Sequence, residues 1–270
     1  MSGSIEDSGG ARVRIALSQG PALAITAEDN LAAITTAVRS AADVGADVLV
    51  TPEMSATGYN IGELSGQRAE PPNGPLASAI SELAQRHGVA ILYGYPEIGP
   101  DGNRNTVVLV GRDGMPLARH HKTHLFGELD HSLFVAGDQL VTQTRFAGLT
   151  VGLAICYEVE FPEFVRAHAD AGTDVLLVPT GLMTPFDVVS RVVVPARAYE
   201  NQIFVVYANR CGVENGLEYC GQSVIVGPDG VDLARAGLGE TLLVADVDPH
   251  ALLTGRRDNT HLADRRTDLY

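Results

Sequence analysis

Several features that would assign a chain to a particular class of protein are scarce or missing here. Only three cysteines occur among 270 residues, and an odd, sparse set argues against a disulfide framework. No CxxC or HExxH pattern occurs, so we expect no metal site. The apolar runs, such as Val89–Tyr93, are far shorter than the roughly 20 residues of a membrane-spanning helix, so no membrane span is predicted.

The amino terminus lacks the basic start and apolar middle of a secretory signal. We therefore predict that residues 1–10 are a disordered lead and that the protein is cytoplasmic. The net charge of −14 repels phosphate backbones, so nucleic acid and anionic membranes are poor partner candidates. His120, His121 and His124 cluster without a convincing set of neighbouring metal ligands. We expect them to lie at the surface or to contact the side chains of a functional site from outside it.

No linker rich in proline, glycine or serine divides the chain, which favours one α/β domain over residues 11–248 with two similar halves. The patterns predict strands at Val13–Ser18, Asp47–Val50, Val89–Tyr95, Asn105–Val110, Leu117–Lys122, Leu149–Cys156, Asp174–Pro179, Ile203–Asn209, Ser223–Val226, Val231–Ala234 and Leu242–Val247. They predict helices at Asp29–Ala42, Pro75–His87, Pro162–Ala171 and Pro185–Tyr199, the last kinked or bounded at Pro195. The polar tail, residues 249–270, is predicted either to be disordered or to pack on a partner subunit.

Three predicted strands end in side chains that can carry chemistry. Cys156 follows an apolar strand and precedes a helix, whose amino terminus would favour the thiolate. Glu53 follows another apolar strand, where partial desolvation should raise its pKa and suit it to act as a base. Lys122, the only lysine in the chain, ends a third strand and could hold an oxyanion. Each position taken alone fits ordinary packing or a surface side chain better than catalysis.

Taken together, the three positions resemble the nitrilase superfamily of carbon–nitrogen hydrolases. The matching segments are Pro52-Glu53 with Gly58-Tyr59, His121-Lys122-Thr123-His124-Leu125-Phe126, Ile155-Cys156-Tyr157-Glu158 with Phe161-Pro162-Glu163, and Arg197–Asn201 followed by Asn209. The similarity runs from about Val13 to Val247.

The resemblance implies a four-layer α-β-β-α sandwich and a Glu-Lys-Cys triad that needs neither cofactor nor metal. Glu53 would take the thiol proton, and Cys156 would attack a carbonyl or nitrile carbon. Lys122 and the backbone N–H of Tyr157 would stabilise the oxyanion, and ammonia would leave. Glu53 would then activate the water that cleaves the thioester.

Many family members carry a second glutamate beside the triad, and two acids here could fill that place. Glu128 and Asp130 both lie at suitable spacings, and the residue type favours Glu128. Plausible walls of the substrate pocket are Tyr59, Phe126, Tyr157, Thr180, Met183 and Tyr207.

The segment that follows Cys156 resembles amidases more than true nitrilases, so we expect hydrolysis of small aliphatic or amino-acid amides. A nitrilase, an N-carbamoyl amidohydrolase and, less favoured, a non-enzymatic binding subunit remain as alternatives. The resemblance also implies a homodimer or higher homo-oligomer through helices near Phe161–Ala171 and Pro185–Tyr199, the second of which is rich in valine.

Overall fold

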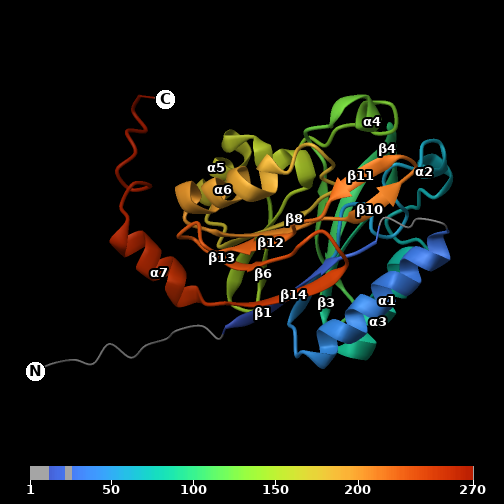
Figure 1. Cartoon of the computed structure of the whole chain (residues 1–270), viewed down its shortest axis with the longest axis horizontal. Coiled ribbons are helices and arrows are strands. Elements are labelled where there is room, and N and C mark those ends of the chain that lie inside the picture. Colours follow the sequence, from blue (N-terminus) through green and yellow to red (C-terminus); the bar gives the residue numbers. More distant parts are fainter. Residues whose placement is uncertain (1–11, 22–25, 270) are drawn as a thin grey trace, which may run out of the picture.

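The computed structural model describes residues 12–21 and 26–269, and two six-stranded sheets form its centre (Figure 1). The first sheet has the order β14-β1-β2-β3-β4-β5. Its strands are β1 (Val13–Gln19), β2 (Val48–Val50), β3 (Ala90–Gly99), β4 (Gly102–Val110), β5 (Pro116–His121) and β14 (Thr241–Val247). The second sheet has the order β13-β12-β9-β8-β7-β6. Its strands are β6 (Thr142–Phe146), β7 (Leu149–Leu153), β8 (Val175–Pro179), β9 (Phe204–Ala208), β12 (Val224–Val226) and β13 (Asp232–Arg235).

The two sheets share one strand pattern, which confirms the prediction of two similar halves. Strands β1, β2 and β3 run parallel, as do β7, β8 and β9. An antiparallel pair follows each set, β4 and β5 in one sheet and β12 and β13 in the other. An antiparallel strand closes the opposite edge, and in the first sheet this strand is β14 from the end of the chain.

A layer of aliphatic side chains joins the sheets face to face. In β1, Val13, Ile15 and Leu17 point into this layer, whereas Ala16 points to the helices outside. The alternation follows from the two-residue period of a strand. The central strands β2, β8 and β9 are apolar and buried on both faces because each sheet is covered on both sides.

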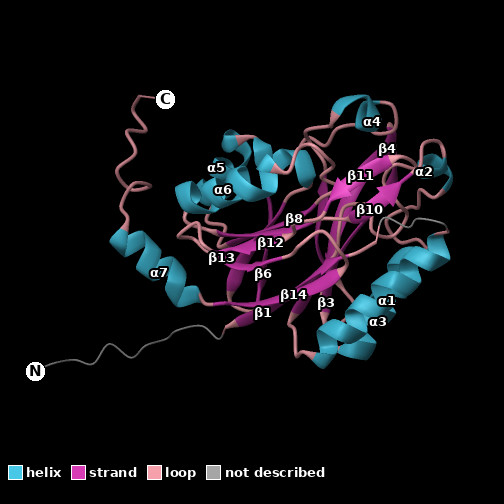
Figure 2. Ribbon diagram, in the orientation of Figure 1, coloured by secondary structure: helices cyan, strands magenta, loops and turns pink. Residues whose placement is uncertain are grey.

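Helices cover the outer face of each sheet, which completes the predicted four-layer α-β-β-α sandwich (Figure 2). Helices α1 (Ala27–Asp43) and α3 (Pro75–His87) pack on the first sheet, and α5 (Pro162–Asp170) and α6 (Val194–Asn201) pack on the second. The shorter helical segments are α2 (Leu64–Gln67), α4 (Gly127–His131), the 3₁₀ turn η1 (Cys156–Glu160) and the π turn η2 (Val189–Val193).

Pro195 marks a change of helix type, as its lack of an N–H predicts. The π turn η2 ends just before it, and α6 begins with Val194 and Pro195. The helical segment begins at Val189 and not at Pro185 as predicted.

A two-stranded ribbon, β10 (Cys211–Glu214) and β11 (Leu217–Cys220), projects from the second half and was not predicted. Its turn is Asn215-Gly216, and both residues are in the left-handed region, with φ of 47° and 83°. Asn-Gly is the strongest short-range signal for such a hairpin because both residues tolerate positive φ. This signal could have located the ribbon from sequence.

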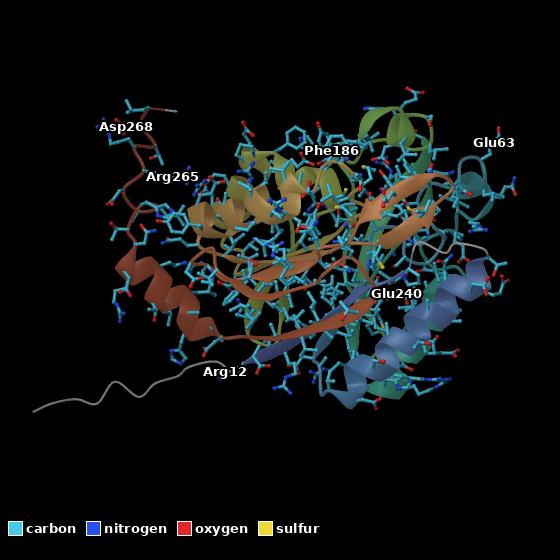
Figure 3. The ribbon with its side chains drawn as sticks, viewed as in Figure 1. Arg12, Glu63, Phe186, Glu240, Arg265 and Asp268 are labelled. Atoms are coloured by element: carbon cyan, nitrogen blue, oxygen red, sulfur yellow. The ribbon has the colours of Figure 1, made fainter. Side chains whose placement is uncertain are left out.

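The tail departs from the expectation of disorder, because Pro249–Asp258 forms helix α7. Leu252 is 3% exposed and joins the layer between the sheets, so the core extends past residue 248. Further along, Arg265, which Figure 3 labels, forms an ion pair with Asp170. The predicted lead, residues 1–10, lies outside the described residues. None of the described helices is both long enough and apolar enough to cross a membrane.

Candidate active site

Glu53 lies in the loop that leaves the carboxyl end of β2, and its side chain is fully buried. Its Oε1 accepts hydrogen bonds from Lys122 Nζ at 2.8 Å and from Asn105 Nδ2 at 2.7 Å. Its Oε2 is buried without a hydrogen-bond partner among the described residues. Burial raises the pKa of Glu53, opposed by the positive charge of Lys122, so the predicted direction is confirmed.

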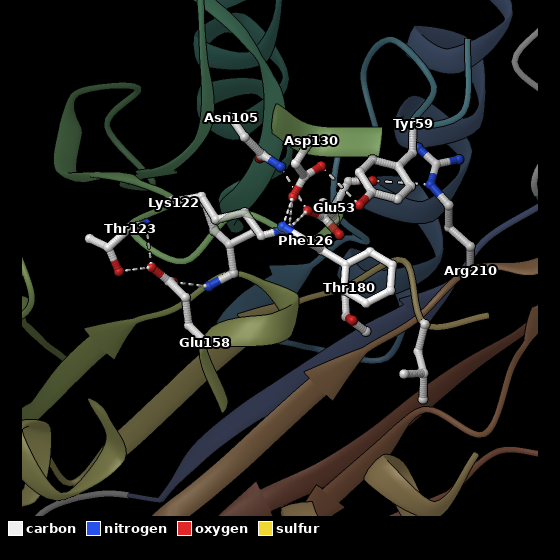
Figure 4. A network of polar contacts seen from close by, with 12 residues as sticks. Glu53, Tyr59, Asn105, Lys122, Thr123, Phe126, Asp130, Glu158, Thr180 and Arg210 are labelled. Atoms are coloured by element: carbon white, nitrogen blue, oxygen red, sulfur yellow. Dashed lines mark hydrogen bonds and ion pairs between the residues drawn. The ribbon is translucent and has the colours of Figure 1, made fainter. Parts of the chain in front are cut away.

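Lys122 directly follows β5, and its side chain is also fully buried. Its Nζ lies 2.8 Å from Glu53 Oε1 and 2.6 Å from Asp130 Oδ2 (Figure 4). Burial alone would lower the pKa of Lys122, but the two carboxylates raise it above its ordinary value. The lysine therefore carries a positive charge between two acids.

Asp130, and not Glu128, is the acid beside Lys122, which corrects the preference stated from sequence. Asp130 in α4 is fully buried and also accepts hydrogen bonds from the Tyr59 hydroxyl at 2.9 Å and the Phe126 amide at 2.9 Å. Glu128 is exposed. Residues two apart on a helix point in nearly opposite directions, since each residue turns the chain by about 100°. Side-chain type was therefore a weaker guide than helix geometry.

Cys156 begins η1, three residues beyond the end of β7 at Leu153, so the predicted strand Leu149–Cys156 is too long. Its φ of 50° is left-handed, a conformation that costs free energy in a residue with a side chain. The buried sulfur lies close to the side chain of Thr180 and the backbone of Gly181.

The thiol is not the low-pKa group that a helix amino terminus would produce. Burial, followed by the negative charge of Glu53, raises the pKa of Cys156, and Lys122 opposes this only in part. Cys156 therefore rests as a protonated thiol and needs a base to react.

Glu158 links the segments that carry Cys156 and Lys122, a role that the sequence did not reveal. Its carboxylate accepts hydrogen bonds from the Ile155 amide at 2.6 Å and from the amide and hydroxyl of Thr123 at 2.7 and 2.6 Å. It also contacts His120 Nε2 at 2.9 Å. Burial acts to raise the pKa of Glu158, but His120 and these hydrogen bonds bring it below its ordinary value.

The predicted histidine cluster is divided among three environments. His120 is buried behind the site against Glu158, whereas His121 contacts Glu97 on the other face of β5. The ring of His124 packs on Phe161 at 4.2 Å between centroids. Among residues 12–21 and 26–269, no three side chains of His, Cys, Asp or Glu form a group that could hold a metal ion.

Arg210 holds the backbone around Glu53 and was also missed. Its guanidinium is buried and donates to the carbonyl oxygens of Glu53 at 3.0 Å and Met54 at 2.5 Å. Arginine was common elsewhere in the chain, so its residue type gave no signal. The neighbouring Asn209 fixes the segment after Thr180, because its side chain bonds both the amide and the carbonyl of Leu182.

The predicted wall residues fall into two groups. Tyr59 and Met183 belong to one apolar cluster, Phe126 packs against it, and the ring of Phe126 lies 5.3 Å from that of Tyr157. Thr180 contacts the sulfur and donates to the hydroxyl of Tyr207, which is buried behind it. Phe186, which sequence reasoning did not single out, packs on Phe126 at 6.2 Å and remains 44% exposed.

The central elements meet at one place because the carboxyl ends of the middle strands of both sheets face each other. The amide of Glu53, after β2, donates to the carbonyl of Thr180, after β8, at 3.3 Å. A thiol, a carboxylate with an unpartnered oxygen and a buried ammonium are the groups that nucleophilic addition to a polarised carbon requires.

Comparison with known proteins places the chain among hydrolases. The sequence model of the carbon–nitrogen hydrolase family matches residues 14–256. A Pseudomonas protegens protein named "Hydrolase in pqqF 5'region" is 46% identical over 265 residues, covering 97% of this chain and 92% of that protein. An (R)-stereoselective amidase of Pseudomonas sp is 38% identical over 82% of this chain and 80% of that protein.

Among solved structures, an amidase from Nesterenkonia sp. AN1 superposes with a TM-score of 0.88 at 35% identity, covering 96% of both chains. That structure is a double mutant in complex with acrylamide. Another structure of the same amidase shows the acetamide moiety of fluoroacetamide added covalently at its active-site cysteine.

Proposed function

The chain belongs to the carbon–nitrogen hydrolase family, and on this premise we propose that it hydrolyses small carboxamides to carboxylate and ammonia through a thioester on Cys156. The observation that carries the proposal is the convergence of Cys156, Glu53 and Lys122 from separate strand ends into one buried site. The Nesterenkonia amidase, with a covalent adduct at its cysteine, supports the same chemistry for this chain.

In the proposed first half of the reaction, Glu53 accepts the thiol proton while Cys156 attacks the amide carbon. Burial raises the pKa of Glu53, which makes it a stronger base than an ordinary carboxylate, and it also raises the pKa of the Cys156 thiol, which therefore needs that base. Lys122 and the backbone N–H of Tyr157 stabilise the oxyanion. Glu53 then gives its proton to the leaving nitrogen, and ammonia departs from the thioester.

In the second half, Glu53 accepts a proton from water, which attacks the thioester carbon. The carbon–sulfur bond breaks, the proton returns to the sulfur, and the carboxylic acid leaves. We propose Asp130 as the fourth acid of the site, because it holds Lys122 in its charged form. Tyr59, Phe126, Tyr157, Thr180 and Met183 are proposed to line the space for the acyl group.

The decisive experiment compares ammonia release from an amide and its matching nitrile, using wild type and Cys156→Ala. We expect the amide to react faster, an acylated Cys156 to be trapped and detected by intact mass, and no turnover by the alanine variant. Faster turnover of the nitrile would favour a nitrilase, and carbon dioxide release from carbamoyl compounds would favour a carbamoyl hydrolase. Unchanged ammonia release by Cys156→Ala would exclude the cysteine mechanism.

We also propose a homodimer through η2 and α6. Val188, Val192 and Tyr199 are 51%, 57% and 50% exposed on this segment, which leaves apolar surface for a second copy of the chain. Helix α7 exposes Leu253 at 64%, and we propose that the tail, residues 249–270, adds to the interface. Sedimentation should give a dimer for wild type and a smaller species for Val192→Asp. A monomeric wild type would contradict this proposal.

A cytoplasmic location is likewise proposed, supported by the small and odd number of cysteines. Cell fractionation should recover the activity with cytoplasmic markers.

A further inference from the structure

The β10–β11 ribbon carries a buried carboxylate that the proposed chemistry does not use. Glu214 ends β10 and is 4% exposed. Its Oε2 accepts hydrogen bonds from the Asn60 amide at 2.7 Å and the Tyr219 hydroxyl at 2.5 Å. The Tyr59 amide lies 3.2 Å from both carboxylate oxygens. Three donors therefore surround one carboxylate.

Tyr59 connects this carboxylate to the site. While its backbone amide contacts Glu214, its hydroxyl donates to Asp130 Oδ1 at 2.9 Å. The other oxygen of Asp130 accepts from Lys122 Nζ at 2.6 Å. Tyr59 thus links the ribbon to the ammonium beside Glu53, with hydrogen bonds at its backbone amide and at its hydroxyl.

The ribbon is also fixed to the segment on the Cys156 side of the site. The Cys220 amide donates to the Leu182 carbonyl at 3.1 Å, and the Thr184 amide donates to the Glu218 carbonyl at 2.9 Å. This segment follows Gly181, whose backbone lies close to the sulfur of Cys156. The ribbon therefore joins the loop that carries Tyr59 to the segment that contacts the nucleophile.

We propose that Glu214 is a positioning residue for the reaction at Cys156, which fixes Tyr59 so that its hydroxyl holds Asp130 against Lys122. This inference rests on the proposed amide hydrolysis. The carboxylate matters because it is acceptor-only, whereas a glutamine would turn an NH₂ group towards at least one of the three donors.

The first test compares Glu214→Gln with Glu218→Gln, a matched change on the same ribbon at an exposed position. Replacing a charge-assisted hydrogen bond by a neutral one should lower kcat about tenfold in Glu214→Gln, with little change in KM. Glu218→Gln should keep the wild-type kcat. A wild-type kcat for Glu214→Gln would overturn the proposal.

A double-mutant cycle separates positioning through Tyr59 from a general loss of structure. If Glu214 acts through the Tyr59 hydroxyl, Tyr59→Phe and the double variant Tyr59→Phe/Glu214→Gln should have about the same kcat, because the link through that hydroxyl is already broken. If the fold-loss in kcat of the double variant equalled the product of the two single losses, Glu214 would not act through Tyr59. Thermal unfolding of each variant reports whether it is folded at the assay temperature.

A second readout distinguishes failure of this inference from failure of the proposed function. The rate of Cys156 alkylation by iodoacetamide, measured against pH, needs no amide turnover. The pH profile of the alkylation rate should be shifted from that of wild type in Glu214→Gln and not in Glu218→Gln. This expectation holds even if wild type proved inactive on every amide tested. An unshifted profile in Glu214→Gln would contradict the positioning role, whereas absent ammonia release by wild type would contradict only the hydrolysis.

Discussion

At the scale of single residues, the site depends on one cation placed between two acids. Lys122 is the only lysine in the chain, and Glu53 and Asp130 both contact its Nζ in full burial. Removing one member of a buried charged group leaves the remaining charges uncompensated. Substitutions at these positions should therefore change both the catalytic rate and the pKa values of the charged groups that remain.

Asp130→Asn should lower kcat/KM by about 100-fold or more, because Lys122 loses one of the charges that orient it. Glu128→Gln is the matched control, since this residue lies on the exposed side of the same short helix. Steady-state ammonia release from one amide measures both. Equal losses in the two variants would contradict the assignment of Asp130.

The pH profile should report the raised pKa of Glu53. The base must be ionised to accept the thiol proton, so kcat/KM should fall on the acid side around a midpoint above the ordinary 4.5. Burial is the main cause of the shift, and the charge of Asp130 adds to it. The residual activity of Asp130→Asn should therefore show a lower acid midpoint than wild type. A midpoint that moved upward would contradict this electrostatic account.

At the scale of elements, the site depends on how closely strands approach the loops that carry its side chains. Gly94 of β3 packs on the loop after β2, and a Cβ at this position would lie 2.7 Å from the backbone nitrogen of Met54. Its amide also donates to Ser55, and its carbonyl accepts from Ala56. The strand therefore fixes the position of the loop that holds Glu53.

Gly94→Ala should destabilise the fold by about 1–3 kcal/mol and lower kcat, because a backbone atom cannot move aside as a flexible side chain would. Gly255→Ala in α7 is the control, since its Cβ would meet nothing nearer than 3.9 Å. That change should stabilise the protein by about 0.5–1 kcal/mol, as expected for alanine in a helix. Chemical denaturation and ammonia release check both variants. An unaltered kcat in Gly94→Ala would show that the loop after β2 can accommodate a Cβ at this position without moving Glu53.

At the scale of the whole molecule, burial couples stability to pH. His168 of α5 is fully buried, and desolvation, followed by the charge of His120, lowers its pKa to about 4 from 6.5. As the pH falls, His168 is protonated in the unfolded chain before it is protonated in the folded protein. The stabilisation that comes from the neutral, buried His168 is therefore complete above pH 6.5. It is lost as the pH falls towards 4.

Between pH 7 and pH 5, His168 should account for a loss of about 2 kcal/mol in the free energy of unfolding. His168→Gln should show a smaller loss over this interval, whereas the exposed His131→Gln should match wild type. Urea denaturation at the two pH values measures the difference. Equal losses in wild type and His168→Gln would rule out His168 as the source.

The sequence by itself determined most strands of the two sheets and the main helices, but not β6, β10, β11 or α7. It singled out Glu53, Lys122 and Cys156 as candidate site residues only when their three motifs were taken together. Apolar periodicity and turn residues are local signals, and each of the three side chains follows a strand that such signals locate. Only the tertiary structure decided the rest. It selected Asp130 over Glu128, raised the pKa of the thiol through burial beside Glu53, and brought Glu158, Arg210 and Glu214 to the site. These outcomes depend on contacts between residues as far apart as Glu53 and Arg210, and no local pattern in the chain encodes such contacts.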